Sequence, residues 1–293
     1  MSTLLDRPVD QPGDGVRVRA LGDADRAELQ RLLDEDPIVN VVVAGRLRAV
    51  RSLDPATFGG VLYGAEDATG QLRAALFAGG NLVPVGDGEA ELRALAHEVG
   101  RTPRSCSSIV GRDTAVRAVW DVLEPLWGTP RAVRERQPLL SLDRDADLVP
   151  ADPRVRAMTL SDFDRYMPAA AAMFTEELDI SPLEVGAADY QRRIAGLIRH
   201  RRAFGIVDDD GSVSFKADIG AVSPHTCQVQ GVWVRPDLRG RGLGGAALPA
   251  VLHQALALAP TVSLYVNDYN TAACRMYERL GMRQVATLRT LLF

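Results

Sequence analysis

The residues most able to do chemistry form a glycine-rich turn between a β-rich run at 227–234 and an apolar helix expected from 240 to about 259. Glycines let the backbone come close to a ligand, and successive N–H groups in such a turn form a concavity that binds anions. The first turn of the helix adds a partial positive charge, and Arg239 and Arg241 add donors that suit phosphate. The sequence therefore predicts a pyrophosphate site. The residues expected to contact it are Arg239, Gly240, Arg241, Gly242, Leu243, Gly244 and Gly245.

Two other kinds of phosphate-binding loop fit this turn less well. A Walker-type loop needs a lysine directly after its last glycine, and the only lysine of the chain, Lys216, lies before the turn. The spacing of Gly240, Gly242 and Gly245 fits a dinucleotide-binding fingerprint. Asp268 would supply its acid, but hairpins precede the turn and too little chain follows it to build a doubly wound sheet. A turn selected only for tight packing is the remaining alternative.

The pattern of the second half predicts a mixed, mostly antiparallel α/β sheet flanked by helices. Strand-like runs alternate with helical periodicity, and the Asp-Asp-Gly turn at 209–211 is typical of a hairpin. The step from 227 to 266 should be a parallel, right-handed strand–helix–strand unit. The expected strands are 154–158, 203–207, 212–222, 227–234 and 262–266, the expected helices are 162–177, 182–200, 240–259 and 270–280, and two short strands end the chain.

Two motifs carry a resemblance to a known family. Residues 239–244 read R-x-x-G-x-G after a strand and at the start of a helix, which resembles the coenzyme A pyrophosphate signature of the GNAT superfamily of N-acetyltransferases. Residues 270–282 resemble the same family's N-x-x-A-x-x-x-Y-x-x-x-G-F segment, with Met282 in place of the usual Phe. The resemblance covers 153–293, with the signature confined to 228–282, and it implies acetyl-CoA as the cosubstrate.

The resemblance also implies roles for individual residues. The backbone N–H groups around Trp233 and Val234 would polarise the thioester carbonyl, where this strand parts from the next one. Tyr277 would be the general acid that protonates the leaving thiolate; a tyrosine that only fills the core is the alternative. Asn270 would cap its helix and contact the pantetheine arm, and capping alone is the alternative. The cofactor-binding residues expected in this segment are Asn267, Asn270 and Ala273.

The general base is not settled by the resemblance. Many relatives have a Glu on the strand before the turn, where this chain has Gln228, and an amide does not accept the proton. Gln228 and Gln230 share one strand face and would instead bind the acceptor or a water. Asp218 is the catalytic candidate we retain, because it lies within an apolar strand, where a charge is either exposed at an edge or buried for a reason. The other candidates are His225, Glu176 and Glu177. Some relatives use water or the chain terminus.

The first half repeats the order of elements without the phosphate chemistry. Its expected strands are 16–21, 60–63, 71–78, 81–85, 105–110 and some around 131–142, and its expected helices are 23–34, 38–51, 88–99 and 112–125. Residues 81–91 lack R-x-x-G-x-G and have acids where phosphate would lie. This layout resembles tandem GNAT proteins with a degenerate N-terminal copy, of which the mycothiol synthases are a two-copy example. Such a copy would bind no coenzyme A and would shape the acceptor site or a homodimer contact.

The expected domains are a flexible tail at 1–14, a degenerate GNAT-like domain at 15–148 and a catalytic domain at 149–293. The polar stretch 143–152 would be the linker between the two copies.

Composition excludes several other classes of protein. The 293 residues carry a formal net charge of −4, which gives no long-range attraction to nucleic acid or to an anionic membrane. No apolar run reaches the roughly 18 residues that span a bilayer, and the start of the chain lacks the layout of a secretory signal. The 3 cysteines are far apart, so neither a disulfide framework nor a metal site is expected. We expect a cytoplasmic protein, and the strong preference for arginine is typical of a GC-rich bacterial genome.

Together these patterns predict direct transfer of an acetyl group from acetyl-CoA to an amine of a small molecule or a protein. The missing base carboxylate and the degenerate first half favour an alternative, a non-catalytic acyl-CoA sensor. A structural scaffold that binds no coenzyme A is the third class.

Overall fold

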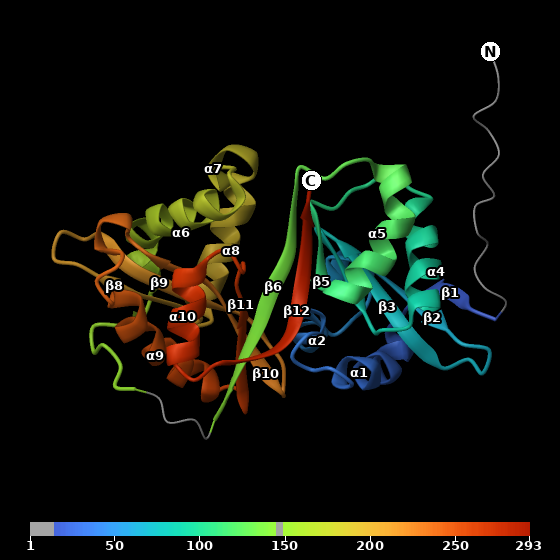
Figure 1. The fold of residues 1–293 in the computed structure, drawn as a ribbon, viewed down its shortest axis with the longest axis horizontal. Helices are drawn as coiled ribbons and strands as arrows, with labels where there is room; N and C mark the ends of the chain where they lie inside the picture. The colour runs from blue at the N-terminus through green and yellow to red at the C-terminus, as the bar shows by residue number, and fades with distance from the viewer. Residues whose placement is uncertain (1–14, 145–148) are drawn as a thin grey trace, which may run out of the picture. The chain divides into compact units, whose positions relative to one another are not determined.

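The computed structural model of the chain describes residues 15–144 and 149–293 (Figure 1). The expected tail and the middle of the expected linker, 145–148, lie outside the described residues. The chain forms two compact units, and each is interrupted in sequence. Unit 1 holds the described part of Met1–Asp36 together with Ala49–Glu135 and Leu288–Phe293, and unit 2 holds Pro37–Arg48 and Arg136–Thr287.

Unit 2 is built on a mixed sheet. Its strands, in spatial order, are β6 (Ala132–Asp143, from Arg136 on), β11 (Thr261–Tyr265), β10 (Thr226–Val234), β9 (Val213–Val222), β8 (Ala203–Val207) and β7 (Arg156–Ala157). The β10–β11 pair is parallel, as the strand–helix–strand pattern predicts, and every other neighbouring pair is antiparallel.

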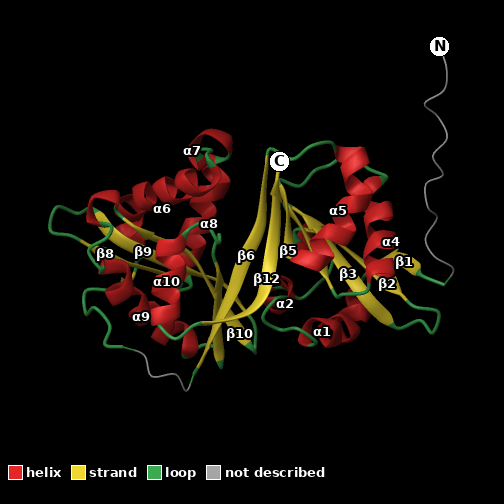
Figure 2. Ribbon diagram, viewed as in Figure 1, coloured by secondary structure: helices red, strands yellow, loops and turns green. Residues whose placement is uncertain are grey.

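Helices cover both faces of this sheet (Figures 1 and 2). Along β9, Phe215, Ala217 and Ile219 pack into a core with α9 and α10, while Lys216 and Asp218 point to the opposite face, toward α6. The expected helix 182–200 is interrupted at Gly186 and forms two helices. The helices of unit 2 are α2 (Val41–Ala49), α6 (Phe163–Leu178), α7 (Pro182–Val185), α8 (Ala187–Arg199), α9 (Leu243–Leu256) and α10 (Thr271–Arg279).

Unit 1 repeats the same sheet pattern. Its strands, in spatial order, are β1 (Arg17–Ala20), β2 (Gly60–Glu66), β3 (Leu72–Gly79), β4 (Asn81–Val85), β5 (Ser108–Arg112) and β12 (Arg283–Leu292, from Leu288 on). The β4–β5 pair is parallel and the others are antiparallel. Its helices are α1 (Arg26–Asp34), α3 (Pro55–Phe58), α4 (Glu89–Gly100) and α5 (Asp113–Trp127), of which α4 and α5 share one core.

The two sheets therefore confirm the tandem fold, with one feature that the sequence did not predict. The last strand of each copy pairs in the other unit: β6 completes unit 2 and β12 completes unit 1. The two short strands expected at the end of the chain are wrong, because Arg283–Leu292 is one strand, and the strands expected around 131–142 are also one strand, Ala132–Asp143. This grouping also differs from a linear division at 148/149.

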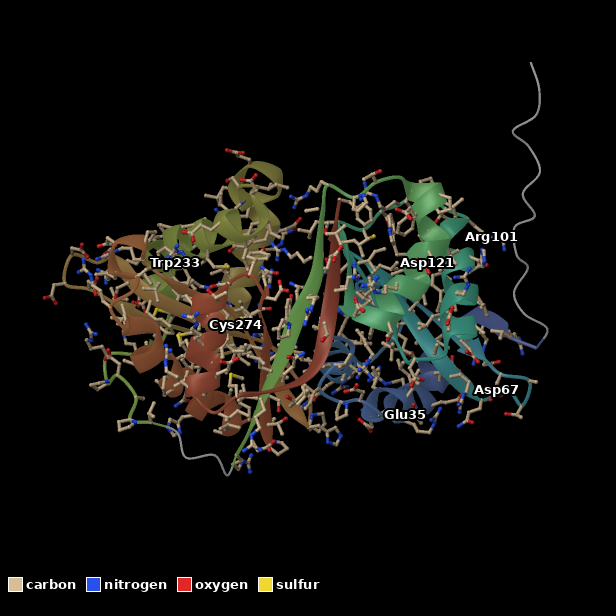
Figure 3. All side chains as sticks on the ribbon, in the orientation of Figure 1. Glu35, Asp67, Arg101, Asp121, Trp233 and Cys274 are labelled. Atoms are coloured by element: carbon tan, nitrogen blue, oxygen red, sulfur yellow. The ribbon has the colours of Figure 1, made fainter. Side chains whose placement is uncertain are left out.

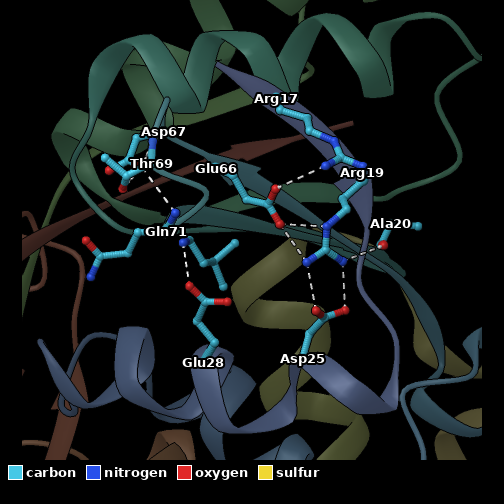
Figure 4. Close-up of polar contacts among 10 residues, drawn as sticks. Arg17, Arg19, Ala20, Asp25, Glu28, Glu66, Asp67, Thr69 and Gln71 are labelled. Atoms are coloured by element: carbon cyan, nitrogen blue, oxygen red, sulfur yellow. Dashed lines mark hydrogen bonds and ion pairs between the residues drawn. The ribbon is translucent and has the colours of Figure 1, made fainter. Parts of the chain in front are cut away.

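The same arginine–aspartate ion pair occurs at the start of both copies. In unit 1 the Arg19 guanidinium donates to both oxygens of Asp25 (2.8 and 2.7 Å), and Figure 4 shows Glu66 on the same guanidinium. In unit 2 Arg156 donates in the same way to Asp162 (2.7 Å for both bonds). These guanidinium bonds lower the pKa of both carboxyl groups. The identical spacing and geometry support a duplicated fold.

The exchange of the last strands makes β12 part of the core of unit 1. Leu291→Ala should lower the free energy of unfolding by about 2–5 kcal/mol, because Leu291 is 1% exposed within the α4–α5 core. Val285→Ala, on the same strand but 48% exposed, should cost no more than about 0.5 kcal/mol. Urea denaturation measures both values, and hydrogen exchange should quicken in β5 for the first variant. Equal, small losses would contradict the place of β12.

Candidate functional site

The turn before α9 has the backbone that its glycines allow. Gly240 and Gly242 have φ of +74° and +83°, which L side chains rarely adopt, and a Cβ at either would meet nothing within 4 Å. Gly242 is the N-cap of α9, and the first turn of α9 carries no acidic residue. The first N–H groups of α9 therefore lie beside open space at the positive end of the helix, as an anion site requires.

The next two glycines face α10, and the tight contact is at Gly244. A Cβ at Gly244 would lie 3.1 Å from Met276 Sδ and 3.4 Å from Val234 Cγ2, and one at Gly245 would lie 3.8 Å from Met276 Cγ. The first turn of α9 thus approaches α10 closely. The tight-packing interpretation fits this half of the turn, and the anion-site interpretation fits the half at 240–242.

The two arginines of the turn have different surroundings. Arg239 donates from Nε to Val234 O (2.9 Å) and from Nη2 to Glu176 Oε2 (2.6 Å). Glu176 also accepts from Trp233 Nε1 (3.0 Å), so it bridges the turn and the end of β10. Arg241 is exposed and, among the described residues, has no hydrogen-bond or ion-pair partner. The charge of Arg241 helps to lower the pKa of nearby Asp237, after the larger effect of Arg235, and its binding to a phosphate stays a prediction, while Arg239 holds the turn.

The parting of β10 and β11 lies beside this turn. Within the described chain their pairing covers only Thr226–Gln228 of β10. Arg235 donates its N–H to Ser214 O on β9 (3.0 Å), and because N–H groups alternate along a strand, the Val234 N–H points away from β9. The family resemblance also implies the Trp233 N–H as a donor. By the same alternation this N–H points to β9, and the indole of Trp233 packs beside α6.

The apolar core on the α9 side brings several predicted residues together. Tyr277 is 6% exposed and belongs to this core, and Val234, Leu243 and Ala273 pack against it. Among the described residues the Tyr277 hydroxyl has no hydrogen-bond partner. Burial raises the pKa of Tyr277 above its usual value, and the nearby charge of Glu177 raises it further. The phenol is thus a protonated donor without an internal acceptor. Cys274 lies one turn before it on α10 (Figure 3).

The asparagines before α10 have structural partners. Asn270 is the N-cap of α10, and its Oδ1 accepts from Ala273 N (3.2 Å), which confirms the expected cap. Asn267 O accepts from Asn270 N (2.9 Å), and Asn267 Oδ1 accepts from Gln137 Nε2 of β6 (2.9 Å). The exchanged strand β6 therefore holds the loop that leads into α10. A contact with pantetheine stays a prediction.

Asp218 lies in a closed environment. It is 2% exposed, and its two oxygens accept from Lys216 Nζ (2.7 Å) and from the Tyr166 hydroxyl (2.7 Å). It faces α6, on the other side of the sheet from the core of Tyr277. No carboxylate oxygen of Asp218 is left facing a substrate, so these contacts favour a positioning role over proton transfer.

The two glutamines of β10 and the other candidate bases lie in different settings. Gln230 lies over Gly220, where a Cβ would collide with its amide group, and Gln228 is buried. Glu176 is engaged by Trp233, as described above. His225 is exposed in the turn before β10, whereas the charge of Glu177 acts on Tyr277.

Comparison with known proteins finds a family match in the second half of the chain. Residues 157–282 match the model of the acetyltransferase (GNAT) family. Residues 60–166 match a domain of unknown function, DUF4081. A comparison with curated proteins gives no match.

Solved structures share the fold over almost the whole chain. A GNAT-family acetyltransferase from Colwellia psychrerythraea has a TM-score of 0.59 at 12% identity, covering 94% of this chain and 99% of that one. A GCN5-related N-acetyltransferase from Sphaerobacter thermophilus has a TM-score of 0.55 at 16% identity, covering 96% and 97%. A tandem GNAT protein from the clavulanic acid biosynthesis pathway has a TM-score of 0.57 at 16% identity, covering 94% and 98%. The chain has a tandem GNAT fold.

Within the part of the chain that the structure describes, no helix has the length and apolar character needed to cross a membrane. No group of three or more His, Cys, Asp or Glu side chains within 15–144 and 149–293 is arranged to hold a metal ion.

The cap of Asn270 and its predicted contact with pantetheine can be separated by substitution. Asn270→Ala should lower the free energy of unfolding by about 1 kcal/mol, because α10 loses its side-chain cap, whereas Asn270→Ser should keep most of it. Both variants should bind coenzyme A several-fold more weakly, because neither has the amide. Urea denaturation and calorimetric titration measure the two effects, with exposed Thr271→Ala as the control. Full affinity in Asn270→Ser would limit Asn270 to capping.

Proposed function

We propose that the protein is an N-acetyltransferase that moves an acetyl group from acetyl-CoA directly to an amine. The observation that carries this proposal is the outward Val234 N–H at the parting of β10 and β11, next to the core that contains the Tyr277 phenol. The open half of the glycine turn and the unpaired Arg241 suit a pyrophosphate at the same end of the sheet. The family match supports acyl-CoA chemistry in general.

Each part of the reaction has a group that suits it. The Val234 N–H would donate to the thioester oxygen, which gains negative charge as the amine attacks the carbonyl carbon. Tyr277 would give its hydroxyl proton to the sulfur as the C–S bond breaks. The amine loses one proton to water or to Glu177, and the same route returns a proton to Tyr277. No net redox change occurs.

Direct transfer is favoured over a covalent acyl-enzyme. The thiol nearest to Tyr277 along α10 is Cys274, and burial, with nearby negative charges, raises the pKa of Cys274. Reactive cysteines in enzymes have a lowered pKa, because the thiolate is the nucleophile. Cys274 therefore has the wrong electrostatic setting to take an acetyl group, and its replacement by alanine should preserve turnover.

Unit 1 lacks the features that suit acetyl-CoA in unit 2. Its β4–β5 pairing covers only Asn81 and Leu82 of β4. Pro84 then removes one N–H, and its ring lies against Gly111 of β5, where a Cβ would be 3.1 Å from Pro84 Cγ. The first turn of α4 carries the acidic Glu89 and Glu91, which would repel a phosphate. We therefore assign the single acetyl-CoA site to unit 2.

Turnover tests the proposed function against a non-catalytic sensor, which the glutamines at 228 and 230 favour. Purified full-length protein with acetyl-CoA should release thiol in the presence of a suitable amine from a panel of small amines, amino acids and peptides. Mass spectrometry should find the acetylated amine. Tight acetyl-CoA binding without turnover across the panel would favour the sensor instead.

Tyr277→Phe tests the proton donor. Its kcat should fall about 10²–10⁴-fold with KM for acetyl-CoA within about threefold, because only the transition state needs the proton. In the wild type the raised pKa keeps the phenol protonated, so kcat should show no loss from this group below about pH 10. Steady-state kinetics from pH 6 to 10 measure both effects, and Tyr63→Phe in unit 1 is the control. Full activity of Tyr277→Phe would remove the phenol from the mechanism.

The stoichiometry of binding tests the assignment of the site. Isothermal titration of the full chain should find one acetyl-CoA per chain. Arg241→Glu should remove that one binding event, because it places a negative charge where the phosphate is expected. Two sites per chain would show that unit 1 also binds the cosubstrate, and one site that survives Arg241→Glu would show that binding does not depend on Arg241.

A further inference from the structure

A buried network on the α6 face of unit 2 connects β9 to β10. Lys216 Nζ donates to Asp218 Oδ2 (2.7 Å) and to Gly231 O on β10 (2.9 Å). The Tyr166 hydroxyl of α6 donates to Asp218 Oδ1 (2.7 Å). Lys216 and Tyr166 are both 0% exposed and Asp218 is 2% exposed. We name Lys216, Asp218, Tyr166 and the Gly231 carbonyl the lysine clamp.

The clamp uses properties that belong to lysine. Its compact ammonium has three donors, two of which reach Asp218 and Gly231, and Nζ also lies 5.5 Å from the centre of the Tyr166 ring. Every other basic side chain among the 34 lysines and arginines is an arginine. The planar fork of arginine suits paired acceptors in one plane, and these acceptors come from two strands. The single lysine of the chain thus stands where a point donor is needed.

The carbonyl that the clamp holds belongs to a β-bulge. Gln230 pairs with Asp218 and Trp233 with Lys216, so two residues of β10, Gly231 and Val232, lie opposite one residue of β9. Gly231 has φ of +58°. A Cβ there would lie 2.8 Å from Lys216 Nζ, so the ammonium fills the space that only glycine leaves free. The bulge and the clamp therefore depend on each other.

The bulge sets the direction of the next N–H. In a trans peptide the C=O of one residue and the N–H of the next point in opposite directions, and the described chain has no cis peptide. Because Lys216 holds the Gly231 C=O toward α6, the Val232 N–H must point away from it. That direction is the side of the sheet where Val232 packs with the core of Tyr277.

We infer that Lys216 is a positioning residue, and that the lysine clamp aims the Val232 N–H at the thioester carbonyl together with the Val234 N–H. This inference rests on the proposed function, because it needs an acyl-CoA in unit 2. It gives Asp218 the task of fixing the ammonium. It also names an N–H donor, Val232, that lies one residue before the predicted pair Trp233 and Val234.

The buried ion pair is better explained by its effect on the direction of the β10 backbone than by its contribution to stability. A buried ion pair often contributes no more stability than well-packed apolar residues of similar volume. Removing one partner leaves an uncompensated charge and is strongly destabilising. The informative variant therefore removes both charges. In Lys216→Met/Asp218→Asn the amide oxygen introduced at position 218 can still accept from Tyr166, and Gly231 O alone loses its donor.

The probe is a ketone analogue of acetyl-CoA in which CH₂ replaces the thioester sulfur and the carbonyl carbon is ¹³C. Wild-type protein should move the carbonyl resonance downfield on binding, because two N–H donors polarise the oxygen. The double variant should lose most of that shift and about 10²–10³-fold in kcat, while its affinity for coenzyme A stays within about threefold. Ser214→Ala is the matched control. Ser214 is 1% exposed on the same face of β9 but donates to Asp208 (2.9 Å), so the shift should stay.

Each outcome decides the inference. A double variant that folds cooperatively and keeps the wild-type shift overturns it, as does a wild type that moves the resonance no further than free analogue. If the double variant does not fold, Lys216→Arg serves, since it keeps both buried charges and replaces the point donor with a planar fork; a partial loss of shift supports the clamp and an unchanged shift overturns it. A wild type that shifts the resonance but acetylates no amine rejects the proposed function, and loss of that shift in the double variant still supports the clamp.

Discussion

The structure of the site depends on one constraint, that β10 and β11 pair for only three residues before they part. Backbone N–H groups on the free edge of β10 must then be satisfied by water or by a ligand, because a buried unpaired N–H is costly. The strand is held on its other edge by β9, so its free edge cannot close by a shift in register. In the proposed function, the thioester oxygen of acetyl-CoA would be the acceptor at this point.

The duplicated sheets show how the same constraint can be used or removed. In unit 1, β4 and β5 also part after a short parallel pairing. There Pro84 supplies a ring instead of an N–H, and Gly111 gives that ring room. Unit 1 therefore places a proline ring at the gap, whereas in unit 2 the proposed function places a ligand there. Fold and function separate here, because the sheet order is shared and only the residues at the gap differ.

The features that the sequence predicted are local in the chain. The turn from Arg239 to Gly245, the cap at Asn270 and the hairpins depend on residues within a few positions of one another, and the patterns of glycine and polarity show them directly. The exchange of β6 and β12 could not be predicted, because the alternation of residues in a strand does not encode a strand partner that is far away in the sequence. The environment of Asp218 could not be predicted for the same reason, since the Tyr166 hydroxyl that contacts it lies 52 positions away in the chain. A signal for the bulge was present in Gly231, a glycine within a β-rich run.

The lysine clamp and the contacts of Arg239 both hold the backbone of β10 in place. Arg239 and Glu176 fix the end of β10 from the solvent side, and Lys216 fixes its middle from the buried side. A main-chain N–H has no rotamer, so its direction is set wholly by how the strand is held. Side chains that hold the strand would therefore control the proposed chemistry without touching the substrate. In the proposed site, Lys216 and Asp218 would help to polarise the carbonyl from the opposite face of the sheet.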